Sequence, residues 1–218
     1  MRELDPERLS TAERYKLLIG GVVPRPIAFV STVSPDGRAN LAPFSFFNAV
    51  SSTPMTLMFC PANDANGGLK DSLLNASPPP VGVGSFVVNV ATEEYARQVA
   101  AAAEPLEHGD SEFELTGLTP IESVAVEPPR VAESPLSFEC LTTEVIRLAP
   151  DIPAGGNIVL GRVVRVHLRE DLVNDRLHVD PERLAAIGRM GGRTYCSTRQ
   201  RFDLPVGRPA LNEPPPSF

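Results

Sequence analysis

The chain has 218 residues and a mass of 23.4 kDa, and 42% of its residues are hydrophobic and 22% charged. This size and composition are those of one globular domain with a full hydrophobic core. The net charge of −7 and the pI of about 5.1 argue against non-specific binding to nucleic acid or to an anionic membrane, so an anionic small ligand would need a local cationic pocket.

The three cysteines, Cys60, Cys140 and Cys196, lie far apart and share no metal-ligand spacing with the histidines. We therefore expect free thiols in a reducing compartment and no metal site. The N-terminal segment lacks the apolar core of a signal peptide, and no apolar run reaches membrane length. These features predict a cytoplasmic protein that binds neither nucleic acid nor membrane.

The first 23 residues predict a helical lead-in, with Ser10 or Thr11 as the N-cap of a helix over 12–18 and Gly20 and Gly21 ending it. A first strand is expected over 27–33, and the turn 34–37 joins it as a hairpin to the stretch 38–51. This stretch is almost continuously apolar and contains Pro43, which cannot donate a hydrogen bond within a sheet.

Further strands are expected at 55–60, 85–90, 124–126, 136–148 and 157–168. Short helices are expected over 69–75, over 92–103 with Thr92 as the capping residue, and over 181–187. The pattern predicts a mainly β protein with peripheral helices (β or α+β) built as a barrel or sandwich. We divide the chain into a lead-in (1–23), one β domain (24–170) and a C-terminal extension with a short helix and a proline-rich tail (171–218).

The glycine pairs fit neither a Rossmann fingerprint nor a P-loop, so a nucleotide site of those kinds is not expected. Residues 67–72 instead combine a helix start with Lys70 and Ser72, a combination that suits a phosphate, although a lone lysine is more often a solvated surface charge. Ser31 and Thr32 are either sheet hydroxyls or phosphate donors.

The apolar stretch 38–51 predicts a wall for a flat ligand, with Asn40, Ser45 and Asn48 as embedded polar groups. Asn48 either bonds local backbone or meets the edge of a ligand. His108, His167 and His178 form no pattern with a nucleophile, and no carboxylate pair stands out. We therefore predict no catalytic side chain.

The run PRPIAFVSTVSPDGRANLAPFSFFNAVSSTPM, followed by GLKDSLLN, SFVVNV and EFELTGLTP, resembles the flavin reductase-like, FMN-binding split-barrel family. A weaker match, RMGGRTY, lies near the C-terminus. The resemblance implies a six-stranded Greek-key split barrel that forms a homodimer, with flavin bound near the subunit interface.

By the same resemblance, the isoalloxazine and ribityl parts of FMN would be lined by Asn40, Leu41, Ala42, Ser45, Phe46 and Asn48. The ribityl-phosphate end would be lined by Ser31, Thr32, Lys70, Asp71 and Ser72. Tyr195 matches a C-terminal aromatic that lies near the flavin in similar proteins. One departure is the sequence GGN at 155–157, where many similar relatives have a histidine before the strand. If that histidine assists turnover of the nicotinamide, its absence affects the reductase step and not flavin binding.

The expected function is that of an FMN-binding, NAD(P)H-dependent flavin reductase, with FAD or riboflavin as exchangeable substrates. Its electrons would pass to free flavin, to a monooxygenase or to another redox partner. Hydride transfer at a flavin needs no side-chain acid or base, which agrees with the lack of a catalytic cluster. Two alternatives stay open: an electron-transfer flavoprotein without direct NAD(P)H activity, and a non-enzymatic split-barrel binding or assembly protein.

Overall fold

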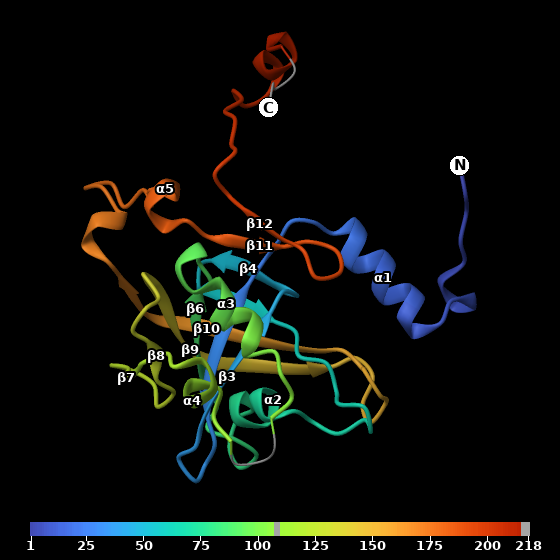
Figure 1. The fold of residues 1–218 in the computed structure, drawn as a ribbon, viewed down its shortest axis with the longest axis vertical. Coiled ribbons are helices and arrows are strands. Elements are labelled where there is room, and N and C mark those ends of the chain that lie inside the picture. The colour runs from blue at the N-terminus through green and yellow to red at the C-terminus, as the bar shows by residue number, and fades with distance from the viewer. Residues whose placement is uncertain (107–109, 215–218) are drawn as a thin grey trace.

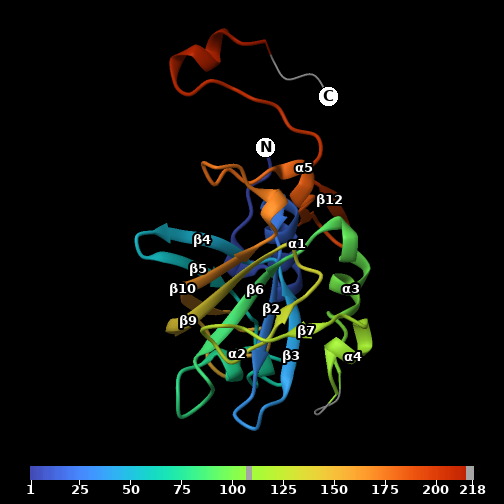
Figure 2. The same cartoon turned by 90° about the vertical axis from the view of Figure 1, so that its left-hand side faces the viewer.

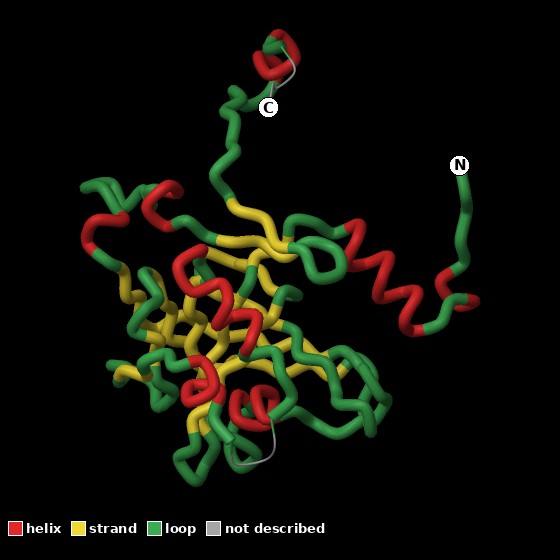
Figure 3. Tube along the Cα trace, viewed as in Figure 1, coloured by secondary structure: helices red, strands yellow, loops and turns green. Residues whose placement is uncertain are grey.

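The computed structural model describes residues 1–106 and 110–214, so His108 lies outside the described residues. A strongly twisted antiparallel sheet forms the centre of the molecule, and short helices cover its lower and front sides (Figure 1). Helix α1 and the C-terminal segment extend away from this body (Figure 3). The expected mainly β architecture with peripheral helices is confirmed.

The helices are short, and most lie at the ends of strands. They are η1 (Pro6–Arg8), α1 (Thr11–Gly21), α2 (Asp71–Ala76), η2 (Glu93–Tyr95), α3 (Ala96–Ala101), α4 (Glu112–Thr116), η3 (Glu170–Leu172), α5 (Pro181–Leu184) and η4 (Arg208–Asn212). None of the helices in the described residues is long and apolar enough to span a membrane.

The strands form three antiparallel sheets. They are β1 (Arg25–Pro26), β2 (Ala28–Val33), β3 (Ala39–Phe44), β4 (Phe47–Ser52), β5 (Met55–Phe59), β6 (Ser85–Val90), β7 (Pro120–Ile121), β8 (Arg130–Val131), β9 (Leu136–Arg147), β10 (Asn157–Leu168), β11 (Ile187–Arg189) and β12 (Tyr195–Ser197). The main sheet has seven strands in the order β3-β2-β6-β9-β10-β5-β4, and β1, β11 and β12 form a small sheet of their own.

The apolar stretch 38–51 forms two strands at opposite ends of the main sheet, not one. Strand β3 pairs with β2, as the expected hairpin, while β4 pairs with β5, and the chain crosses between the two sheet edges at Ser45 and Phe46. Strands β4 and β5 project from the body as a hairpin (Figure 2). This break accounts for the seventh strand of the sheet, where six were expected. Pro43 lies in an edge strand, where a missing N–H is tolerated.

Strand β2 is buried on both faces and separates two hydrophobic cores. On one face, Phe29 and Leu41 pack with α3 and its neighbours around Tyr95 and Val99. On the other face, Val30 packs with the sheet interior around Phe59 and Phe86, and α2 contributes Leu73. Two-sided burial explains why this strand is a nearly continuous apolar run and not an alternating one.

Most expected elements are confirmed, and the exceptions have local physical causes. Residues 124–126 form no strand, because the Val124 and Ala125 amides bind the Glu139 carboxylate instead of a neighbouring strand. Ser10 caps α1 with a full capping box, as expected. Thr92 forms no capping hydrogen bond, and the helix predicted after it starts as a 3₁₀ turn.

The C-terminal segment holds a small hairpin that was not expected. The predicted helix over 181–187 ends at Leu184, and Ile187 begins β11, which pairs with β1 on one side and β12 on the other. In this hairpin Arg189 lies directly opposite Tyr195.

Candidate functional site

Two adjoining cavities follow edge strand β3 and form one groove. The larger, the Lys70 cavity, has a volume of about 540 Å³ and is lined by Asn40, Ala42, Pro43, Phe44, Asp64, Leu69, Lys70, Asp71, Ser72, Ala102, Ala103, Glu104, Pro105, Leu106 and Glu112. The smaller, the Arg189 cavity, has a volume of about 210 Å³ and is lined by Tyr15, Ile27, Pro43, Ser45, Val99, Ala103, Arg189 and Tyr195. The two cavities share Pro43 and Ala103 in their lining. The extended segment 40–45, which passes along both cavities, is about 17 Å long at ~3.3 Å per residue.

A network of amides and hydroxyls fixes one end of the Lys70 cavity. The Asn40 Nδ2 group donates to Ser72 Oγ at 2.9 Å and to Thr32 Oγ1 at 3.3 Å. Buried Asn75 donates a further hydrogen bond of 3.1 Å to the same threonine. These contacts join the three elements β2, β3 and α2 and hold the side chains that line this end.

Lys70 is the N-cap residue of α2 and the only cationic side chain among the described residues that line this cavity. Its side chain is exposed and forms no cap hydrogen bond. Acidic residues surround it, and Asp64 is already engaged, because its carboxylate accepts hydrogen bonds from the Asn66 and Gly68 amides. The cavity is therefore polar at the Lys70 end and apolar along Ala42 and Pro43.

Glu112 connects α4 to the exposed edge of β3. Its carboxylate accepts a hydrogen bond of 3.0 Å from the Leu41 amide, a donor on the edge strand. Burial raises the pKa of the Glu112 carboxyl, and Asp71 adds to this effect while the Leu41 hydrogen bond opposes it.

At the other end of the groove, Arg25 holds the turn between β3 and β4. Its side chain donates to Ser45 Oγ at 3.2 Å and to the carbonyls of Ile19, Val22 and Met190 at 2.7, 2.9 and 3.0 Å. The residue is only 5% exposed, and all of these acceptors are neutral. Its charge is therefore stabilised by carbonyl dipoles, including those at the C-terminus of α1.

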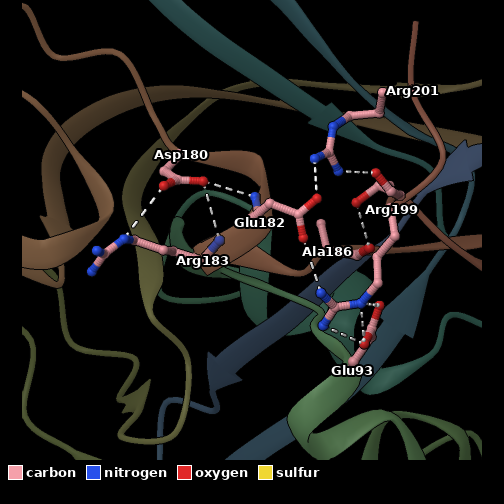
Figure 4. Close-up of polar contacts among 8 residues, drawn as sticks. Glu93, Asp180, Glu182, Arg183, Ala186, Arg199 and Arg201 are labelled. Atoms are coloured by element: carbon pink, nitrogen blue, oxygen red, sulfur yellow. Dashed lines mark hydrogen bonds and ion pairs between the residues drawn. The ribbon is translucent and has the colours of Figure 1, made fainter.

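Tyr195 reaches the Arg189 cavity because the C-terminal hairpin is fixed from several sides. Arg189 stacks over the Tyr195 ring at 4.4 Å from its centroid. Beyond β12, Arg199 binds Glu93 through two nitrogens at 2.9–3.0 Å and Glu182 at 3.0 Å, and Arg201 also binds Glu182 (Figure 4). This ion-pair network joins the segment after β12 to η2 and α5.

The structure brings seven of the twelve expected site residues to the lining of this groove. Asn40, Ala42, Lys70, Asp71 and Ser72 line the Lys70 cavity, and Ser45 and Tyr195 line the Arg189 cavity. Thr32 is fully buried behind them, where its hydroxyl accepts from Asn40 and Asn75. Ser31 faces the opposite side of β2, where its hydroxyl donates to the Pro129 carbonyl. Leu41 is buried in the core next to α3.

Phe46 and Asn48 lie outside both cavities. Asn48 is exposed on edge strand β4 and accepts a hydrogen bond from the neighbouring Ala49 amide at 2.9 Å, which is the local-backbone interpretation. Asn157 is fully buried and donates to Asn63 Oδ1 at 2.9 Å and to the Pro61 carbonyl at 3.1 Å. It fixes the loop at the start of β10 and lines neither cavity.

Sequence reasoning missed Arg25 and Glu112 as residues that hold the edge strand of the groove, and Arg189 as the charged residue of the adjoining cavity. Arg25 contacts Ser45 and Met190 across 20 and 165 residues of sequence, so no local pattern indicates its position. Glu112 is 71 residues from its partner Leu41. Arg189 is within the RMGGRTY match, and its pairing with Tyr195 became apparent only with the hairpin. No cluster of three metal-ligating side chains exists in the part of the chain that the structure describes.

The two edge strands of the main antiparallel sheet, β3 and β4, are consecutive in sequence, as in a split barrel. The groove along β3 is a site for an elongated, partly apolar ligand. The chain belongs to the flavin reductase-like family: the model of the flavin reductase like domain matches residues 20–187. This places it among flavin-dependent oxidoreductases and confirms the split-barrel fold.

Three solved structures show the extent of the similarity. Nitrilotriacetate monooxygenase component B from Bacillus cereus is 35% identical, with a TM-score of 0.87 over 94% of this chain and 98% of that one. The 2-nitrobenzoate 2-nitroreductase of Pseudomonas fluorescens is 28% identical, with a TM-score of 0.82 and 95% and 97% coverage. A flavin reductase-type split-barrel protein from Shewanella frigidimarina, at 20% identity, has a TM-score of 0.79 over 95% of this chain and all of that one, and shows the fold alone.

Proposed function

We propose that this protein is an FMN-binding oxidoreductase that takes hydride from NAD(P)H and passes electrons to free flavin or another acceptor. The observation that carries the proposal is the groove along β3, which combines an apolar wall with a polar, lysine-bearing end in a member of the flavin reductase-like family. FAD and riboflavin are proposed as exchangeable substrates of the same groove.

The groove residues fit the parts of FMN in order along β3. Ala42 and Pro43 offer a flat apolar wall for a ring system, and Ser45 and Tyr195 stand at its far end. Asn40 and Ser72 supply amide and hydroxyl groups for the ribityl chain, and buried Thr32 holds the Asn40 amide from behind. Lys70 supplies the cation for the phosphate, and Asp71 accepts ribityl hydroxyls. FMN, when bound, supplies the two-electron redox chemistry.

The protein's own contribution is to position the ring and to restrict water. Asn40 fixes Ser72 by a hydrogen bond, so the polar end is preorganised before a ligand arrives. Glu112 closes the edge of β3 against α4 and occupies the Leu41 amide. Leu41 therefore contributes backbone and core packing and not a side-chain contact, and Ser31 supports the strand from its opposite face.

A homodimer accounts for the remaining expected residues. The hairpin of β4 and β5 carries exposed apolar side chains, with Val50 at 50% and Met55 at 41% exposure, and α1 exposes Tyr15, Leu17 and Leu18. Tyr15 of α1 packs against Phe46, which directly precedes β4, and exposed apolar side chains gathered on neighbouring elements are typical of an interaction site. In such a dimer Phe46 and Asn48 would meet the flavin across the interface, since they lie outside the groove of their own chain.

The redox partner is proposed from the relatives. The similar structure from Bacillus cereus is named component B of nitrilotriacetate monooxygenase. This name supports a role for the present protein in delivering reduced flavin to a separate monooxygenase. The three cysteines are free, which supports the cytoplasm as the compartment.

Anaerobic reduction tests the catalytic part of the proposal. Purified protein loaded with FMN is expected to lose the flavin absorbance band on addition of NADH or NADPH, and to regain it when free flavin or oxygen is added. An FMN-loaded protein that neither nucleotide bleaches would instead be an electron-transfer flavoprotein. A protein that binds no flavin at all would be a split-barrel binding or assembly protein.

A further inference from the structure

The Arg189 cavity differs from the Lys70 cavity in charge, and the difference defines a second ligand. Four acidic residues, Asp64, Asp71, Glu104 and Glu112, line the Lys70 cavity beside its one lysine. Among the described residues that line the Arg189 cavity, Arg189 is the only charged one. In a protein of net charge −7, this end of the groove is a local cationic site.

Among the described residues, no carboxylate forms an ion pair with Arg189. The contacts of Arg189 are the Tyr195 ring and the Gly192 carbonyl, to which it donates at 2.7 Å. Behind the lining residue Ser45 lies the buried guanidinium of Arg25, whose acceptors are three carbonyls and the Ser45 hydroxyl. Arg189 thus lines the cavity with neutral partners, Arg25 adds positive charge behind Ser45, and an anion in the cavity would gain a charge-assisted hydrogen bond from Arg189.

The shape and lining of the cavity limit what the anion can be. Its volume is about 210 Å³, and a dry protein cavity of about 150 Å³ accommodates benzene. Ile27, Pro43 and Val99 supply apolar walls, and the Tyr195 ring supplies an aromatic face. A dinucleotide is too large for this space. The planar fork of Arg189 matches the two oxygens of a carboxylate.

We propose that the Arg189 cavity binds a small aromatic carboxylate, held by Arg189 at its charged end and by Tyr195 and the apolar walls at its ring. Because the cavity shares Pro43 and Ala103 with the Lys70 cavity, the bound ring lies next to the position assigned to the flavin. Its position beside the flavin rests on the proposed function, whereas its binding does not.

The proposal is tested by calorimetric titration of the purified protein with benzoate and with its neutral isostere benzamide. Each titration is done with and without saturating FMN. Benzoate is expected to bind at one per chain, and at least about tenfold more tightly than benzamide, the gain of one charge-assisted hydrogen bond. Arg189→Met should lower benzoate affinity to the benzamide level, and Arg189→Lys should keep part of the preference. Arg193→Met, an exposed arginine of the same hairpin, is the matched control and should change nothing.

FMN affinity of the same variants separates this site from the flavin site. Arg189→Met should leave FMN binding within about twofold of wild type, a difference well below the ~1.4 kcal/mol of a tenfold change. No benzoate binding, equal binding of benzoate and benzamide, or a parallel loss of FMN and benzoate in Arg189→Met would overturn the proposal. Benzoate binding without any FMN binding would instead overturn the proposed function and leave this site standing.

Discussion

The Asn40 amide donates a hydrogen bond of 2.9 Å to the Ser72 hydroxyl, and this contact joins the edge strand β3 to helix α2. Both residues lie at the polar end of the groove, one on the strand that also carries the apolar wall and the other on the helix that begins at Lys70. The geometry of the candidate flavin site therefore depends on how these two elements are held together.

Lys70→Ala is expected to weaken FMN binding about fivefold and to leave riboflavin binding unchanged, because only FMN carries the phosphate and an exposed ion pair contributes about 1 kcal/mol or less. Fluorescence titration with both ligands measures the difference. The only other lysine, Lys16 on α1, provides the matched control Lys16→Ala, which should affect neither ligand. Equal losses for FMN and riboflavin would place Lys70 away from the phosphate. High salt should reduce the Lys70 effect.

Glu112→Gln is expected to make the protein more stable near pH 7 and to change little below pH 4.5, the ordinary value for this group. The pKa of Glu112 is raised in the folded state, so folding favours the protonated form, and wild type loses stability as the pH rises through the folded pKa. Glutamine keeps an oxygen for the Leu41 amide and carries no charge to desolvate. Urea unfolding at both pH values measures the effect.

The exposed Glu114 on the same helix supplies the control for this experiment. Glu114→Gln should keep the free energy of unfolding within about 0.5 kcal/mol of wild type at both pH values. A Glu112→Gln protein that is less stable than wild type at pH 7 would mean that the ionised carboxylate is the stabilising form.

Glu139→Leu is expected to lower the free energy of unfolding by about 3 kcal/mol, because it removes a buried acceptor and leaves the donors that face it without a partner. The fully buried Glu139 carboxylate accepts from the Val124 and Ala125 amides at 2.8 and 2.6 Å and also contacts the His167 ring. Burial alone would raise the pKa of Glu139, but these hydrogen bonds bring it below its usual value.

Because the folded pKa of Glu139 is depressed, its contribution is present above pH 4.5 and is lost as the pH falls through the folded pKa. The gap between wild type and Glu139→Leu should therefore narrow in acid. Glu144→Leu, at an exposed position of the same strand, should stay within about 0.5 kcal/mol of wild type. A Glu139→Leu protein as stable as wild type would show that residues 124–125 are held by other contacts.

Gly161→Ala is expected to destabilise the barrel by about 1–3 kcal/mol, the usual cost of overpacking a core. A Cβ at Gly161 would lie 2.3 Å from Cζ of Phe86 and 3.0 Å from Cβ of Cys140, within the core of the main sheet. Gly156→Ala, one residue before β10, meets only Leu148 at 3.6 Å and serves as the control. Thermal unfolding of the two variants compares them, and equal melting temperatures would contradict the packing described.

The sequence predicted the long strands well and the site only in part, and the reason is the range of the contacts. Strands β9 and β10 follow local apolar patterns, and their bounds match the expected ones almost residue for residue. The break at Ser45 was not predicted, because the apolar pattern continues through it and only pairing with distant strands separates β3 from β4.

The polar end of the groove could be anticipated because Lys70, Asp71 and Ser72 are adjacent in sequence and Asn40 stands out in an apolar run. Arg25 and Glu112 could not, since each acquires its role from partners far along the chain. Asn48 was expected inside an apolar wall and is exposed instead, because β4 forms the opposite edge of the sheet.

The central claim is that the groove along β3 holds FMN. Titration of the purified wild-type protein with FMN, followed through the flavin absorbance and fluorescence, tests it most directly. A saturable change in the flavin spectrum that ends at one FMN per chain is the predicted result. A spectrum that stays that of free FMN at every protein concentration would contradict the claim.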